Sequence, residues 1–154
     1  MIPSCVKLRG APFRVLPPGI HWASLFEIGV RFGQTPHRAW LFDGVVNVAT
    51  ALQRANCVRM YLNGSFVTEK THPNDFDGCW DAANVNVALL DPVLLNFSNG
   101  RSAQKQKYRG EMFIADGWNL GTGTFLDFFQ REKLTGLPKG IIGVDLQQIG
   151  GTLR

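Results

Sequence analysis

Two aspartates stand one residue apart in an apolar segment: Asp75 and Asp77, within NGSFVTEKTHPNDFDGCWD at residues 63–81. In a strand, both side chains would point to the same face, with their Cα atoms about 6.6 Å apart and their carboxylates about 5 Å apart. At an effective dielectric constant of about 20, two such charges repel by about 3 kcal/mol. A divalent cation between the two carboxylates would turn this net repulsion into a net attraction. Because oxygen-only ligands favour Mg²⁺ or Mn²⁺, the pair predicts a site for one of these ions.

A turn suited to phosphate precedes the two aspartates. Gly64 lets the backbone approach a ligand closely, and the N–H groups around Ser65 can surround an anion. Lys70, in the loop between the turn and the aspartates, is a candidate phosphate contact. Alone, an Asp-x-Asp pair is more often a solvated strand edge. A calcium loop of the EF-hand type is excluded, because its sixth position, counted from Asp75, is Trp80 and not glycine.

These residues resemble a known pattern. Gly64-Ser65, nine intervening residues and then Asp75-Phe76-Asp77 is similar to the G-S-x(n)-D-h-D signature of the nucleotidyltransferase superfamily, which includes DNA polymerase β and the minimal nucleotidyltransferases. The chain from about residue 16 to 146 also resembles a family of short, largely uncharacterised bacterial and phage proteins. The segments that carry this second resemblance are LPPGI, RFG-x-x-PHR, NGSFVT, DFDGCWD, LLDPVLL, GEMF and PKGI.

The resemblance implies a role for each residue. Gly64 and Ser65 would hold the β- and γ-phosphates of a nucleoside triphosphate, and Asp75 and Asp77 would bind Mg²⁺ and take part in catalysis. An acceptor hydroxyl would attack the α-phosphorus in line, at a site with two metal ions. A third carboxylate on a later strand would complete the catalytic and metal-binding set.

Two residues are candidates for the third carboxylate, Glu111 in RGEMFIA and Asp145 in IIGVDLQ. Both have the local pattern of a polar residue in an apolar strand, so the pattern does not separate them. The segment between Asp77 and Glu111 leaves room for one helix and a returning strand, whereas Asp145 requires a further strand and helix. The spacing therefore favours Glu111.

The function implied is that of a Mg²⁺-dependent (or Mn²⁺-dependent) nucleotidyltransferase-like protein, which transfers a nucleotidyl group from a nucleoside triphosphate to an unknown acceptor: a protein, an RNA or a small molecule. By analogy with the superfamily, its setting would be a toxin–antitoxin or phage-defence system, with a cognate toxin or antitoxin as candidate partner. The alternative is a catalytically inactive nucleotide-binding or antitoxin-like partner-binding protein of the same fold.

Strands and helices alternate along the chain. We expect a single domain of the α/β (α+β) class, with a nucleotidyltransferase-like mixed β-sheet flanked by helices at residues 21–154, preceded by an N-terminal arm at 1–20. Thr35-Pro36 and the spacing of the apolar residues after it predict a long helix. The expected helices span 22–32, 36–55, 101–109 and 124–133, the last opened by Gly121-Thr122-Gly123-Thr124, and the expected strands span 57–62, 75–81, 111–115 and 138–149.

Two groups of side chains have competing interpretations. Arg101, Lys105 and Arg109 share one face of the third predicted helix and could contact triphosphate, but charge runs usually form a solvated face, which we expect here. Phe125 and Phe128, with Phe129, have helical spacing and predict core packing rather than a base-stacking platform.

Composition limits the remaining classes. A chain of 154 residues with 45% hydrophobic and 18% charged residues suits one core. A formal charge of +4 weakly favours a nucleotide, nucleic acid or acidic partner. The three cysteines form no C-x-x-C pair, which favours neither disulfides nor zinc. The sequence contains no signal-like segment and no apolar run of the roughly 18 residues that a membrane span needs, so we expect a cytoplasmic protein with no membrane contact.

Overall fold

The structure is a computed structural model that describes residues 1–119 and 123–148. The helices are α1 (Leu25–Phe32), α2 (Pro36–Arg54), α3 (Ser98–Tyr108) and α4 (Phe125–Phe129). The strands are β1 (Gly19–Trp22), β2 (Arg59–Asn63), β3 (Phe76–Trp80), β4 (Gly110–Ile114), β5 (Trp118–Asn119), β6 (Gly123–Thr124) and β7 (Gly140–Asp145). Short 3₁₀ helices lie at Ser65–Val67, Val87–Leu89, Pro92–Leu95 and Leu146–Gln148.

Five strands form one mixed sheet in the order β1-β7-β2-β3-β4. Strand β2 is antiparallel to both of its neighbours, whereas β1 is parallel to β7 and β3 is parallel to β4. Parallel strands cannot be joined by a hairpin, and the segment containing α3 provides the crossover from β3 to β4. Strands β5 and β6 form a separate two-stranded ribbon. The expected single α+β domain with a mixed sheet is therefore confirmed.

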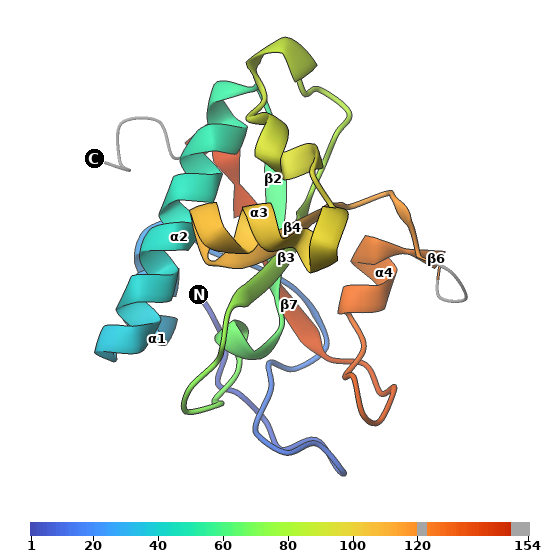
Figure 1. Ribbon diagram of the computed structural model, residues 1–154. Coiled ribbons are helices and arrows are strands. Elements are labelled where there is room, and N and C mark those ends of the chain that lie inside the picture. The colour runs from blue at the N-terminus through green and yellow to red at the C-terminus, as the bar shows by residue number, and fades with distance from the viewer. Residues whose placement is uncertain (120–122, 149–154) are drawn as a thin grey trace.

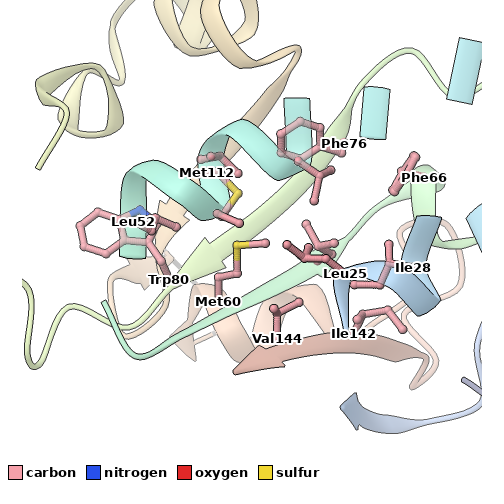
Figure 2. Packing of buried hydrophobic residues seen from close by; sticks show 14 of the residues in the cluster. Leu25, Ile28, Leu52, Met60, Phe66, Phe76, Trp80, Met112, Ile142 and Val144 are labelled. Carbon is pink, nitrogen blue, oxygen red and sulfur yellow. The ribbon is translucent and has the colours of Figure 1, made fainter. Parts of the chain in front are cut away.

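Helices cover both faces of the sheet, and α2 and α4 lie on opposite sides of the strands (Figure 1). On the α2 face, Leu52 packs with sheet residues such as Met60, Trp80 and Met112 (Figure 2). On the α4 face, a smaller cluster contains Tyr61, Cys79, Ala115, Phe129 and Ile141. Side chains alternate between the faces along a strand, so Phe76 enters the α2 core while Asp77 points to the α4 face.

The capping signals in the sequence position the first two helices. Thr35 accepts a hydrogen bond from the backbone N–H of Arg38, and Pro36 occupies the first helical position, as expected for α2. Ser24 and Glu27 form a capping box that starts α1 at Leu25, three residues after the predicted start. No helix among the described residues has both the length and the apolarity to cross a bilayer.

Two secondary-structure predictions were wrong. Residues 19–22, expected to end an irregular arm and begin a helix, form β1, because they pair with β7 from the far end of the chain. The helix expected over 124–133 spans only Phe125–Phe129, since the chain then forms a hairpin-like turn in which Arg131 pairs with Pro138. Gly121, Thr122 and Ile149, which belonged to predicted elements, lie outside the described residues, as do residues 150–154.

Candidate functional site

Three polar residues lie side by side on adjacent strands of the α4 face. Asp77 on β3 is in register with Asn63 on β2 and with Glu111 on β4. Asp75 directly precedes β3. The parallel β3–β4 pair brings Glu111 beside Asp77, because both strands start at the same end of the sheet.

The three carboxylates converge. Asp75, Asp77 and Glu111 each offer an oxygen atom, and these atoms all lie within 4.8 Å of one another. Asp145 is elsewhere: it pairs with Arg59, at the opposite end of β2 from Asn63. Of the two candidates for the third carboxylate, the structure therefore brings Glu111, and not Asp145, to the aspartate pair. A cluster of half-buried carboxylate oxygens is a donor set that could hold Mg²⁺ or Mn²⁺.

The carboxylates of the cluster shift one another's pKa values. Burial, a hydrogen bond with Glu111 and the nearby charge of Asp75 raise the pKa of Asp77 to about 8. Burial acts to raise the pKa of Glu111 as well, but hydrogen bonds with Asp77 and Arg101 outweigh it and lower that pKa. The raised pKa of Asp77 and the lowered pKa of Glu111 both favour a protonated Asp77 beside an ionised Glu111. Burial and the charge of Glu111 also raise the pKa of Asp75.

Two basic side chains from α3 hold Glu111. The Nε and Nη2 atoms of Arg101 each lie 2.8 Å from Oε1 of Glu111, and Nζ of Lys105 lies 3.4 Å from the same oxygen. The Arg101 guanidinium also lies 5.4 Å from the centre of the Phe113 ring. The expectation of a solvated basic face was therefore wrong for Arg101, because the turn that starts α3 directs this side chain to β4.

The Gly64 turn lies against the carboxylates. Gly64 has a φ of 79°, and a Cβ atom there would lie 2.4 Å from Oδ2 of Asp77. Only glycine fits this position, for conformational and steric reasons. Ser65 begins the following 3₁₀ helix, and its carbonyl accepts a 2.6 Å hydrogen bond from the Thr68 hydroxyl. The ammonium of Lys70, the predicted phosphate contact, lies 5.9 Å from the centre of the Phe13 ring.

A cavity of about 550 Å³ opens beside the cluster. Carboxylates, basic groups and four phenylalanines form its wall. The described residues that line it are Asn63, Gly64, Asp77, Arg101, Glu111, Phe113, Phe125, Phe128, Phe129, Arg131, Lys133 and Lys139, a set without Ser65 and Lys70.

The phenylalanines of α4 do not all belong to the core. Phe129 is buried, as predicted, but Phe128 is 40% exposed and Phe125 is half-buried. Phe125 stacks on Phe113 with ring centres 4.5 Å apart. The prediction of core packing was wrong for Phe128, because its side of α4 faces the cavity while the neighbouring Phe129 enters the core.

Lys139 was not anticipated from the sequence. It directly precedes β7, is only 8% exposed, and donates a 2.9 Å hydrogen bond from Nζ to Oδ1 of Asn63. Burial lowers its pKa, and the charges of Asp77 and Glu132 act in the opposite direction. The position of Lys139 before an apolar strand was visible in the sequence, but nothing there showed that β7 starts beside Asn63.

Arg38 is a second residue that sequence reasoning missed. Its buried guanidinium donates to the carbonyls of Phe66, Thr68 and Lys70 at 2.6–2.9 Å, and to that of Phe32 at 3.1 Å. Three of these carbonyls belong to the loop that follows Gly64. Arg38 therefore fixes the path of this loop from the side of α2.

No curated protein and no solved structure matches the chain. A family model matches residues 11–145, a range that includes the three carboxylates, Gly64, Arg38 and Lys139. Its description assigns no activity. On the strength of this match the chain belongs to the family described as "Family of unknown function (DUF6932)".

Proposed function

We propose that this protein is a Mg²⁺- or Mn²⁺-dependent nucleotidyltransferase-like enzyme that acts on a nucleoside triphosphate and an acceptor hydroxyl. The observation that supports it best is the convergence of Asp75, Asp77 and Glu111 beside Gly64, where Asp77 and Glu111 line a cavity that phenylalanines also line. Pockets for small ligands usually combine apolar walls with a few placed polar groups. A nucleotide has this same division into a charged chain and a flat base.

Each part of the cavity has a place in this reaction. Asp75, Asp77 and Glu111 would hold the metal ions, which stabilise the attacking and leaving oxygens when bound. The basic side chains of Arg101, Arg131, Lys133 and Lys139 line the same cavity and offset the charge of the triphosphate. Phe128, which lines the cavity and is 40% exposed, presents ring surface on which a base can stack.

The transfer forms a bond between the acceptor oxygen and the α-phosphorus and breaks the bond to pyrophosphate. The acceptor hydroxyl loses its proton to a carboxylate of the cluster, and pyrophosphate leaves on the opposite side of the phosphorus. The pKa of about 8 at Asp77 means that this group must first release its own proton before it can ligate a cation.

A second candidate function, nucleotide binding without transfer, is favoured by one observation. Arg101 and Lys105 form ion pairs with Glu111, the third carboxylate, in the place where a metal ion would bind. A protein that kept this ion pair permanently would bind a nucleotide through its basic groups and lack the complete carboxylate set.

The two functions are separated by incubation of the purified protein with each of four labelled nucleoside triphosphates, Mn²⁺ and a cell extract. We expect a labelled product from the parent and none from Asp77→Asn, because the variant cannot supply the second carboxylate. Asp43→Asn is the matched control, since Asp43 is exposed on α2, and should retain the activity. Calorimetric binding of a nucleotide with no labelled product would support the second function, and absence of both binding and product would contradict both.

A further inference from the structure

Arg101 has a backbone that differs from the rest of α3. Asn99, Gly100 and Arg101 have φ values of 52°, 64° and 61°, so three consecutive residues are left-handed. Two of them are not glycine, and side chains with a Cβ rarely adopt this conformation. The turn therefore stores conformational strain next to the carboxylates, and a change of backbone here would relieve strain rather than create it.

The strained turn places Arg101 on Glu111. Two nitrogens of its guanidinium and one of Lys105 approach a single atom, Oε1 of Glu111. A carboxylate oxygen that ligates Mg²⁺ lies only about 2.0–2.1 Å from the ion. An ion on this oxygen would lie next to a guanidinium of the same sign of charge. An ion on the other oxygen, Oε2, would also be repelled by the two cations on Oε1, so Arg101 and a divalent cation compete for Glu111.

Arg101 has room to move to a second partner. Its side chain is 34% exposed and lines the 550 Å³ cavity. A guanidinium binds phosphate oxygens through the same paired N–H groups that it uses for a carboxylate. An anion in the cavity would therefore compete with Glu111 for Arg101.

We propose that Arg101 exchanges partners: it pairs with Glu111 in the free protein and pairs with the phosphates of the ligand once a divalent cation has bound to Glu111. This inference rests on the proposed function. The exchange couples the binding of the two ligands. The phosphates draw Arg101 away from Glu111 and free it for the cation, and the cation releases Arg101 for the phosphates, so each ligand increases the affinity for the other. Arg101 would thus contact substrate and also prevent a cation from binding without it.

The experiment measures Mn²⁺ and inorganic triphosphate binding separately by calorimetry. In Arg101→Met we expect Mn²⁺ alone to bind about tenfold more tightly than in the parent, because the closer of the two competing cations is gone. Triphosphate in the presence of saturating Mn²⁺ should bind about tenfold more weakly, because its own partner is gone. An arginine with only a structural function would weaken both. Arg101→Lys, which keeps the charge without the paired N–H groups, should shift both affinities in the same directions by less.

Lys107→Met is the matched control, since Lys107 is on the same helix but pairs with Asp91 away from the cluster. It should leave both affinities at the parent values. An equal gain in Mn²⁺ affinity in Lys107→Met would overturn the proposal, because the effect would then be one of net charge. If the parent binds Mn²⁺ through Asp77 but Arg101→Met binds it no more tightly, the exchange is wrong and the proposed function stands. If neither the parent nor Arg101→Met binds Mn²⁺ or triphosphate, the exchange and the proposed function are both wrong.

Discussion

At the scale of single residues, the cluster is balanced without a metal ion. The raised pKa of Asp77 favours its protonated form, and the basic groups of Arg101 and Lys105 lie on Glu111. Buried carboxylates are costly when they remain charged and unpaired, so the proton and the two cations stabilise the site in the free protein. A divalent cation would therefore have to displace the proton and the basic groups that already neutralise the carboxylates.

The raised pKa of Asp77 predicts how stability depends on pH. An unfolded aspartate loses its proton near pH 3.9, whereas folded Asp77 keeps it up to about pH 8. Between these values the folded state holds the extra proton, so stability falls as pH rises, by at most about 1.4 kcal/mol per pH unit. Burial also raises the pKa of Asp75, which acts in the same direction. The lowered pKa of Glu111 affects stability near and below the usual glutamate value of 4.5, which is more acidic than the range measured next.

Urea denaturation of the metal-free protein between about pH 5 and pH 8 measures this slope. In Asp77→Asn the slope should be markedly smaller, because the variant cannot titrate. Asp43→Asn should keep the parent slope. If the parent and Asp77→Asn show the same slope over this interval, Asp77 is already ionised in the folded protein.

At the scale of elements, the site depends on strands that are close in sequence and on strands that are far apart in sequence. The order of α3 and β4 after β3 could be predicted, since a parallel return beside the aspartate strand needs one crossover, and this correctly favoured Glu111 over Asp145 in position. Strand β1 could not be predicted in this way, because it pairs with β7, which is far from it in the sequence. Lys139 and Arg38 were missed for the same reason: their hydrogen-bond partners are distant in sequence.

Arg38 is the element-scale link between α2 and the loop after Gly64. In Arg38→Met the four carbonyls that it satisfies would lose their donor while the apolar volume is largely kept. We expect the free energy of unfolding to fall by about 3 kcal/mol or more, because each buried acceptor without a donor costs about 1–3 kcal/mol. Faster amide hydrogen exchange in residues 66–70 would show that the loop has loosened.

Arg54→Met serves as the control, because Arg54 is exposed in the last turn of the same helix. It should change stability by less than about 0.5 kcal/mol. If Arg38→Met is as stable as this control, the buried hydrogen bonds do not determine the path of the loop.

At the scale of the whole molecule, the cavity is assembled from segments across the chain. Its wall takes residues from β2, β3, β4, α3 and α4 and from the turn before β7. A ligand that fills it would contact segments between Asn63 and Lys139 that are far apart in the sequence. Binding should therefore appear as a stabilisation of the entire domain and not of one loop.

Thermal unfolding should reveal which part of a nucleotide the aromatic wall holds. A ligand at about 100 times its Kd adds about 2.7 kcal/mol, which raises Tm by about 5–10 °C for a domain of this size. With Mn²⁺ present, we expect the preferred nucleoside triphosphate to stabilise the parent more than an equal concentration of inorganic triphosphate. The difference comes from stacking of the base, which contributes about 1–3 kcal/mol.

Phe128→Ala should reduce this difference and leave the effect of inorganic triphosphate unchanged, because the 40% exposed ring contributes little to the core. Leu134→Ala, at a position that is 72% exposed and does not line the cavity among the described residues, should behave as the parent. If nucleotide and inorganic triphosphate stabilise the parent equally, the phenylalanines do not contact a base. The cavity would then select for phosphate and cation alone, and the nucleotide would have to be replaced in the proposed reaction by another phosphorylated substrate.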